Sequence, residues 1–319
     1  MSKRFAVLGS PISHSKSPAI HLAAYRVLGL DWEYGRAEVS RGGLRKFIDE
    51  LDGHWDGFSV TMPLKEDATR FADLHDEPST LTKATNTLVI DEFGKWHGYN
   101  TDIFGLIQAL AKTLPALPKH VLVIGSGATA VSAITAVSQF APKAHIQVFA
   151  RNSEARDAVI RYAKELGLRA GAAKRLKSAT AKAHLTISTV PSGAMDEQAE
   201  ALMGLRFWKP GGALMDVAYN PWPSKLAQSW QRHEQVVISG LEMLIWQAVA
   251  QIRLFYAADM AVELPNEVAV IEAMREAAQN KPGNLSFLGL ATRRAVAQLA
   301  LCCAGSPQGS RTGLSSWRF

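Results

Sequence analysis

Two residues of opposite charge stand where they could carry out acid–base chemistry, each at the end of a predicted element. Lys65 follows the apolar strand pattern GFSVTMP (57–63), and Asp102 ends the stretch GYNTD (98–102), just before a helical pattern. Each has an ordinary interpretation, because Lys65 could be a solvated turn residue and Asp102 could cap the helix. A lysine and a carboxylate that meet at the open ends of one domain could also exchange a proton with a hydroxyl or carbonyl group, as acid–base chemistry on a secondary alcohol requires.

The polar stretch SPISHSKSP (10–18) carries serines at alternate positions, Ser13, Ser15 and Ser17. Their hydroxyl groups could converge on one carboxylate or hydroxyl group of a ligand. The alternative is a polar loop in which Ser17, directly before Pro18, caps the next helix. The residues by themselves favour this second interpretation.

The stretch VLVIGSGATA (121–130) contains a glycine pattern of the type G-x-G-x-x-A, made by Gly125, Gly127 and Ala130. Glycines allow a backbone to approach a pyrophosphate closely, and the N-terminus of a helix favours the negative charge. The pattern alone is weak, because glycine turns are common. Its place between a strand pattern and a helical pattern favours dinucleotide binding.

The next strand pattern ends in VFARNSEAR (148–156), with Arg151 where an NAD-binding protein usually has an acidic residue that bonds the ribose hydroxyls. Arg156 follows nearby. An arginine can instead bond a 2′-phosphate through two charge-assisted hydrogen bonds. A solvated surface arginine is the alternative, but the distance from the glycine pattern favours NADP as the cofactor.

Two series of strand and helix patterns must position these residues. The first alternates strand and helix and ends in a hairpin with its turn near Gly94: 5–9, 18–28, 32–39, 43–51, 57–63 and 85–102. The second begins after LPALPK (114–119) with the strand–turn–helix pattern at the glycines and continues with apolar strand patterns: 145–152, 185–192, 212–221 and 235–240. Residues 241–279 have a helical pattern with a break near Pro265.

The fold class that these patterns predict is α/β, with an N-terminal α/β substrate domain and a Rossmann-like doubly wound domain. We expect the substrate domain to span residues 1–112 and to be completed by the helices of 241–279. The dinucleotide-binding domain would span 113–240. Residues 280–319 form a basic tail, rich in Ser, Gly and Arg towards its end, which we expect to be disordered.

Composition excludes several classes of protein. The chain has 319 residues, of which 47% are hydrophobic and 20% charged, and no apolar run approaches the length of a membrane span. The adjacent Cys302 and Cys303 offer neither a disulfide framework nor metal-ligand spacing, which indicates a reducing cytoplasm. From Ala277 onward there are five basic residues and no acidic residue, so most of the net charge of +6 belongs to the tail. The rest of the chain shows no electrostatic footprint for nucleic acid.

Seven motifs resemble the shikimate dehydrogenase family in their order and rough spacing: SPISHSKSP, SVTMPLK, ATNTL, GYNTD, GSGATA, DVAYNP and SGLEMLIWQA. The resemblance covers about residues 4–275, and the ARN variant after the fifth motif resembles the actinobacterial branch. It implies an enzyme, an oxidoreductase that uses NADPH to reduce 3-dehydroshikimate to shikimate in the pathway to chorismate and aromatic amino acids.

The resemblance also implies roles for individual residues. Lys65 would be the acid–base residue, and Asp102 would orient both Lys65 and the substrate. Ser15 and Ser17 would bind the substrate carboxylate, with Tyr219 nearby. The ring hydroxyls would be bonded by Asp102 and by three further residues: Thr61, Asn86 and Gln247. The cofactor would be lined by Gly125, Ser126, Gly127, Ala128, Thr129, Ala130, Arg151, Asn152, Val217 and Gly240. No metal is implied.

The sequence departs from the family at three places. Ala128 stands where the family often has a second glycine, ARN replaces the usual NRT, and the tail beyond about Gln279 has no counterpart. The alternatives are a quinate/shikimate dehydrogenase that uses NAD and, from another class, a non-catalytic dinucleotide-binding regulator. The expected partner is a small-molecule substrate, with no nucleic acid and no membrane, and a homodimer is left open.

Overall fold

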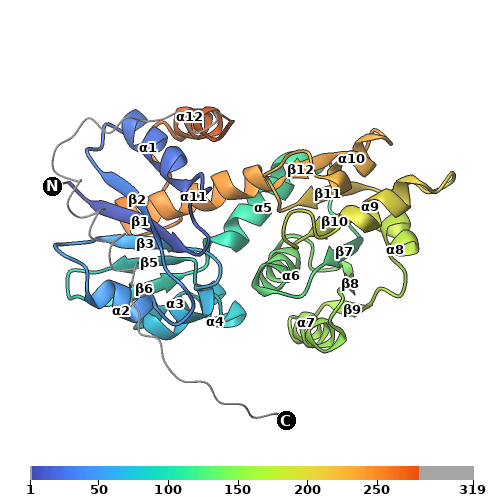
Figure 1. Cartoon of the computed structure of the whole chain (residues 1–319), viewed down its shortest axis with the longest axis horizontal. Helices are drawn as coiled ribbons and strands as arrows, with labels where there is room; N and C mark the ends of the chain where they lie inside the picture. Colours follow the sequence, from blue (N-terminus) through green and yellow to red (C-terminus); the bar gives the residue numbers. More distant parts are fainter. Residues whose placement is uncertain (1, 280–319) are drawn as a thin grey trace, which may run out of the picture. The chain divides into compact units, whose positions relative to one another are not determined.

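The computed structural model describes residues 2–279, which contain two six-stranded sheets and the helices that cover them (Figure 1). The strands are β1 Arg4–Gly9, β2 Glu33–Glu38, β3 Gly57–Val60, β4 Leu74–His75, β5 Thr87–Ile90, β6 Trp96–Tyr99, β7 His120–Ile124, β8 His145–Phe149, β9 Arg169–Ala172, β10 Leu185–Ser188, β11 Ala213–Asp216 and β12 Val237–Ser239. The helices are α1 Ser17–Val27, α2 Leu44–Asp49, α3 Lys65–Phe71, α4 Glu77–Thr82, α5 Thr101–Thr113, α6 Ala128–Phe140, α7 Ser153–Glu165, α8 Leu176–Lys182, α9 Asp196–Met203, α10 Lys225–Gln231, α11 Gly240–Ala257 and α12 Glu267–Gln279.

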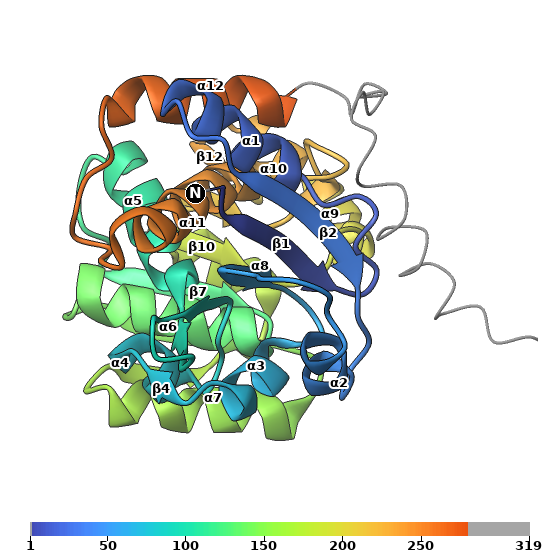
Figure 2. The ribbon, with the colours of Figure 1, turned by 90° about the vertical axis from the view of Figure 1, so that its left-hand side faces the viewer.

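The first sheet is mixed and has the strand order β2-β1-β3-β5-β6-β4. Strand β1 pairs in parallel with β2 and β3, whereas β5 and β6 form an antiparallel hairpin whose turn contains Gly94. Alternate residues of β1 belong to different cores: Phe5 and Val7 pack with α1, and Ala6 and Leu8 pack in the core that contains residues of α2 and α3. Figure 2 shows α1 and α12 side by side above β1 and β2.

The second sheet is entirely parallel, with the order β12-β11-β10-β7-β8-β9. Its central strand β7 has apolar residues at every position from Val121 to Ile124, because helices cover both faces. Val121 and Val123 pack in the core that includes α6 and α7, and Leu122 and Ile124 pack in the core that includes α8, α9 and α10. This is the doubly wound arrangement that the sequence predicts, so the predicted fold class is confirmed.

Helices α5 and α11 pack against each other and link elements of both sheets, since α5 also contacts α6 and α11 also contacts β5 and β12. Their side-by-side course is visible in Figure 1, with α11 in orange and α5 in green. The predicted break near Pro265 lies in the segment between α11 and α12 and is confirmed. None of the helices within residues 2–279 has the length and apolar character that crossing a membrane requires.

Three details differ from the sequence predictions. The strand predicted for 57–63 ends at Val60, and Lys65 begins helix α3, a helix that the sequence did not predict. The short elements β4, β9 and α4 were missed because each has at most six residues and little periodicity. Both sheets belong to one compact unit, so the domain bounds 1–112, 113–240 and 241–279 stay predictions. The expected disordered tail, 280–319, lies outside the described residues.

Candidate active site

Lys65 and Asp102 form an ion pair, with Lys65 Nζ donating a hydrogen bond to Asp102 Oδ2. Only 16% of the Lys65 side chain and 7% of the Asp102 side chain are exposed, so bulk water screens this pair little. The second carboxylate oxygen of Asp102 accepts a hydrogen bond from Asn86 Nδ2 at 2.8 Å. The carboxylate is therefore held at both oxygens, and it fixes the direction of the lysine ammonium group.

The capping interpretation of Asp102 is wrong. The N-cap of α5 is Asn100, whose Oδ1 accepts a hydrogen bond from the backbone N–H of Asp102 at 3.1 Å. Asp102 stands inside the first turn of α5, where the helix dipole favours a negative charge. Because Asn100 satisfies the helix end, the carboxylate of Asp102 is left for Lys65. The interpretation of Lys65 as a solvated turn residue is wrong as well, since Lys65 is helical and largely buried.

Asn86, directly before β5, has only one amide orientation that suits its neighbours. Its Oδ1 accepts from the backbone N–H of Thr101 at 2.9 Å and from Thr87 Oγ1 at 2.8 Å. The amide nitrogen is therefore the end that faces Asp102. Residues from three elements, α3, α5 and the start of β5, thus meet at one buried carboxylate.

A cavity of about 270 Å³ opens beside this ion pair. All eight residues to which the sequence analysis gave catalytic or substrate-binding roles line it: Ser15, Ser17, Thr61, Lys65, Asn86, Asp102, Tyr219 and Gln247. Three of the predicted cofactor residues, Thr129, Val217 and Gly240, also line it. The cavity does not include the other seven: Gly125, Ser126, Gly127, Ala128, Ala130, Arg151 and Asn152. The structure thus gives the predicted substrate residues one shared location, while their individual roles stay predictions.

The serine stretch reaches the cavity through Ser15 and Ser17, whereas Ser13 does not line it. Ser17 is the first residue of α1, and the N-cap position is occupied by Lys16, which makes no side-chain cap bond. The interpretation of Ser17 as the helix cap is therefore wrong. Instead, the Ser15 hydroxyl accepts a hydrogen bond from the backbone N–H of Ser17 at 3.3 Å, which holds the two serines next to each other.

Sequence reasoning missed Ser59 and Gln251, which also line the cavity. Ser59 Oγ donates to Gln251 Oε1 at 2.9 Å, and Tyr34 Oη donates to Ser59 Oγ at 2.6 Å. A signal was present in the sequence, because Gln247 and Gln251 are four residues apart in helix α11 and so share one face. Ser59 stands within the motif SVTMPLK itself.

These residues belong to a chain of hydrogen bonds that ends at the carboxylate of Asp102. Each member donates to the next, in the order Tyr34, Ser59, Gln251, Thr87, Asn86 and Asp102. Hydrogen bonds that run in one direction polarise one another, and in a buried chain this strengthens the last bond. The chain therefore stabilises the negative charge of Asp102 from the side opposite to Lys65.

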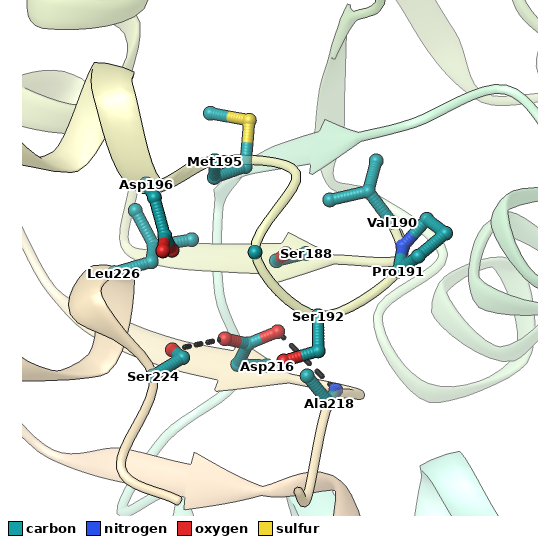
Figure 3. Close-up of a pocket in the computed structure, with 11 residues that line it drawn as sticks. Ser188, Val190, Pro191, Ser192, Met195, Asp196, Asp216, Ala218, Ser224 and Leu226 are labelled. Atoms are coloured by element: carbon teal, nitrogen blue, oxygen red, sulfur yellow. Dashed lines mark hydrogen bonds between the residues drawn. The ribbon is translucent and has the colours of Figure 1, made fainter. Parts of the chain in front are cut away.

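Tyr219 lies in the loop between β11 and α10. Asp216, the last residue of β11, accepts hydrogen bonds from residues near both ends of this loop (Figure 3). The carboxylate of Asp216 accepts from Ser224 Oγ at 2.6 Å and from the backbone N–H of Ala218 at 3.3 Å. Burial raises the pKa of Asp216, and the bond from Ser224 opposes that rise. Burial also raises the pKa of Tyr219, so its hydroxyl group remains a hydrogen-bond donor at neutral pH.

The glycine loop connects β7 to α6 and has the shape that a pyrophosphate requires. Gly125 has φ of +119°, and a Cβ there would lie 2.3 Å from Thr189 Oγ1, so only glycine fits. Gly127 is the N-cap of α6, offers no side chain to the first helical amides and has open space where a Cβ would point. An anion can therefore approach the N-terminus of this helix, and these residues fit a dinucleotide.

The end of β8 has no acidic residue, in agreement with the prediction. Arg151 is exposed, and Asn152 caps α7 through its Oδ1, which accepts from the backbone N–H of Ala155 at 3.0 Å. Arg156, by contrast, forms an ion pair with Asp157, at 2.8 Å from Nη2. Arg151 is therefore the cation of this loop that remains available for a phosphate.

Comparisons with known proteins give a consistent result. A family model described as the shikimate dehydrogenase substrate binding domain matches residues 7–88. A crystal structure of a shikimate 5-dehydrogenase from Mycobacterium fortuitum is 37% identical, with a TM-score of 0.73, and the match covers 87% of this chain and 98% of that chain. The shikimate 5-dehydrogenase of Thermus thermophilus in complex with NADP(H) and shikimate is 30% identical, with a TM-score of 0.72 and coverage of 86% and 99%. The shikimate dehydrogenase (NADP(+)) of Staphylococcus aureus strain JH9 is 28% identical over 276 residues, 85% of this chain and 99% of the relative.

Proposed function

The chain belongs to the shikimate dehydrogenase family, and we propose that it catalyses the reversible NADPH-dependent reduction of 3-dehydroshikimate to shikimate. The observation that carries this proposal is the shared cavity, in which the Lys65–Asp102 pair and the six other predicted substrate residues face one space. Its volume of about 270 Å³ suits a small ring acid, because pockets for drug-sized ligands begin at about 300 Å³.

The substrate would be oriented by its two ends. Ser15 and Ser17 would donate hydrogen bonds to the substrate carboxylate, and Tyr219 would approach the same group with a hydroxyl that stays protonated. The ring hydroxyls would be bonded by four residues from four segments of the chain: Thr61, Asn86, Asp102 and Gln247. Bonds at both ends fix the ring, which places its carbonyl carbon against the cofactor and its carbonyl oxygen against Lys65.

Lys65 would supply the proton. The hydride for the carbonyl carbon would come from NADPH, and negative charge would develop on the carbonyl oxygen. A lysine ammonium group stabilises that charge and can donate a proton to it, since lysine side chains are protonated at neutral pH. Asp102 would hold the ammonium group in position through the hydrogen bond at Oδ2. In the oxidation of shikimate, the neutral lysine would take the proton back.

The cofactor would lie along the carboxyl edge of the second sheet. The glycine loop and the N-terminus of α6 would hold the pyrophosphate, and Arg151 and Asn152 would meet the adenosine end. Val217 and Gly240, which line the cavity, would border the nicotinamide end. These assignments rest on the geometry of the loop and on the family to which the chain belongs.

A steady-state assay of the purified chain tests the proposal. We expect shikimate to be oxidised with NADP, much more slowly with NAD, and quinate to be the poorer substrate. Comparable rates with quinate and NAD would favour a quinate/shikimate dehydrogenase. If neither substrate is oxidised while NADPH still binds, the proposed reaction is wrong and a non-catalytic dinucleotide-binding regulator becomes the better account.

Four further expectations concern the location, the partners and the domains of the enzyme. We infer that the enzyme works in the cytoplasm, because its relatives are biosynthetic enzymes. A homodimer, an absence of nucleic-acid binding and the division into a substrate domain and a dinucleotide-binding domain also remain predictions. The molar mass in solution tests the first, and retention on heparin as a function of salt tests the second.

A further inference from the structure

Two further basic residues stand beside Arg151, although the sequence analysis gave them no role. Strand β9 pairs in parallel with β8, with Val148 opposite Ala172, and beyond this last pair Ala173 still donates a backbone hydrogen bond to Val148 at 2.9 Å. The chain then continues with Lys174 and Arg175, next to the segment in which β8 continues to Arg151. Strand β9 is the edge strand of the second sheet, and β8 is its neighbour.

The order of these features along the carboxyl edge matches the order of groups in a dinucleotide. The glycine loop follows β7, Arg151 follows β8, and Lys174 and Arg175 follow β9. Since neighbouring strands are about 4.8 Å apart, the segments that follow β7, β8 and β9 are each separated from the next by about this distance. A pyrophosphate at the N-terminus of α6 therefore leaves the adenosine ribose near the end of β8, between the glycine loop and the residues that follow β9.

The charges at this edge are exposed and available. Arg151, Lys174 and Arg175 are all exposed. Among the ion pairs of residues 2–279, none involves any of the three. Arg156, near the start of α7, is already paired with Asp157. A group with two negative charges next to Arg151 would therefore find its second cation in the segment after β9 rather than at Arg156.

We propose that Lys174 and Arg175 complete, together with Arg151, the site for the 2′-phosphate of NADP, and so determine the preference for NADP over NAD. This inference rests on the proposed function only in that it names the same cofactor. The 2′-phosphate is the only group by which NADP differs from NAD, so cations placed at this point discriminate without affecting the common part of the cofactor. Arg175 can bond two phosphate oxygens through its guanidinium fork, and Lys174 adds a compact charge.

Direct binding tests the proposal without any turnover. Titrations of the full chain with NADPH and with NADH, followed by cofactor fluorescence, give both dissociation constants for the wild type, Lys174→Ala, Arg175→Ala and the double variant. We expect the double variant to bind NADPH at least ten-fold more weakly and NADH within two-fold of the wild type. Arg175→Lys should recover part of the NADPH affinity. Adenosine 2′-monophosphate should lose affinity in the same variants, whereas adenosine 5′-monophosphate should not.

The matched control is Arg169→Ala, which removes the same charge from the opposite end of β9. It should leave both affinities unchanged, which separates a local contact from the general charge of the surface. An unchanged NADPH affinity in the double variant would overturn the proposal, as would an equal loss for NADPH and NADH. A chain that binds NADPH through these residues but does not oxidise shikimate would retain this inference and reject the proposed reaction.

Discussion

At the scale of single residues, Lys65, Asp102 and Asn86 could be found in the sequence, but the other groups that hold Asp102 in place could not. The types and positions of Lys65 and Asp102 could be read because a charged residue at the end of an apolar strand or before a helix is conspicuous. The resemblance to the family added Gln247 and gave Ser15 and Ser17 a substrate-binding role, and its prediction of the family is confirmed by the comparisons. Asn100 as the cap of α5 and Gln251 as a member of the hydrogen-bond chain were missed, because which of several polar side chains reaches a given atom depends on tertiary contacts.

The role of Lys65 predicts a loss of turnover rather than of binding. In Lys65→Ala, kcat for shikimate should fall by about 10² to 10⁴, because a positioned acid–base group contributes about that factor. The KM for shikimate should stay within a few-fold, since the other seven predicted site residues that line the cavity remain. Lys65→Met, which keeps the aliphatic stem, should behave alike, and Lys46→Ala, in the exposed pair with Glu50, should not change kcat. A kcat of either Lys65 variant within a few-fold of the wild type would contradict the assigned role.

A second residue-scale prediction concerns His21, which is buried behind the serines. Its Nδ1 donates to the backbone carbonyl of Ser17 at 2.9 Å, and its ring stacks on Tyr34 with centroids 3.9 Å apart. Burial lowers the pKa of His21 from 6.5 to about 4, so the folded protein keeps it neutral where the unfolded chain binds a proton. The stability that comes from keeping His21 neutral is therefore fully present above pH 6.5 and is lost as the pH falls towards 4. Between these two values, the free energy of unfolding decreases by up to about 1.4 kcal/mol per pH unit.

Urea unfolding between pH 7.5 and pH 4.5 measures this contribution. His21→Phe, which retains an aromatic ring for stacking, should show a smaller decrease of unfolding free energy over this range than the wild type. His54→Ala, whose side chain is 77% exposed, should keep the wild-type decrease. Equal pH dependence in the wild type and in His21→Phe would show that His21 titrates normally in the folded protein.

At the scale of elements, the contact between α5 and α11 positions the site, because α5 carries Asp102 and α11 carries Gln247. The two helices approach closely at Gly105, where a Cβ would lie 2.7 Å from the backbone oxygen of Met243 and 3.0 Å from Gln247 Cβ. Sequence reasoning predicted both helices but not this contact. A glycine inside a helical pattern indicates that some close approach exists, but not which element makes it.

Gly105→Ala should therefore affect stability and substrate binding together. The added methyl group meets backbone rather than a movable side chain, so we expect a loss of about 1–3 kcal/mol in unfolding free energy. The separation of the helices should raise the KM for shikimate several-fold. Ala111→Gly, at an exposed position of α5, should cost about 0.5–1 kcal/mol through helix propensity and leave the KM unchanged. An unchanged KM in Gly105→Ala would show that the spacing of α5 and α11 does not set the site.

The loop that carries Tyr219 gives a second prediction at this scale. Ser224 closes the loop by donating to Asp216, and it also caps α10 by accepting from the backbone N–H of Ala227 at 3.0 Å. Ser224→Ala removes both bonds and should lower the unfolding free energy by about 1–3 kcal/mol while it raises the KM for shikimate. Ser229→Ala, which removes one bond to a backbone carbonyl in the same helix, should lower stability without a change in KM. An equal KM for shikimate in Ser224→Ala and Ser229→Ala would mean that the hydrogen bond between Ser224 and Asp216 does not position Tyr219.

At the scale of the whole molecule, the order of elements was more predictable than their pairing. The alternation of strands and helices, the parallel second sheet and the helical stretch 241–279 were predicted from apolar patterns and glycine positions. The mixed first sheet was not, because the place of β5 and β6 beside β3 depends on pairing between distant segments. The cavity arises from such pairing, since residues as distant in the sequence as Ser15 and Gln251 line the same space.

The last prediction concerns the residues after Lys281, which extend beyond the part of the chain that matches its relatives. The Staphylococcus aureus relative is covered over 99% of its length by 85% of this chain, and the last described helix, α12, ends at Gln279. A chain that ends at Lys281 keeps every residue of the cavity, the glycine loop and the proposed phosphate site. We therefore expect its kcat/KM for shikimate to stay within about two-fold of that of the full chain. Its free energy of unfolding should differ by no more than about 0.5 kcal/mol, the size of ordinary surface effects. Retention on heparin should decrease, because four arginines are removed: Arg293, Arg294, Arg311 and Arg318. A ten-fold loss of kcat/KM at unchanged stability would instead assign the residues after Lys281 a part in the active site.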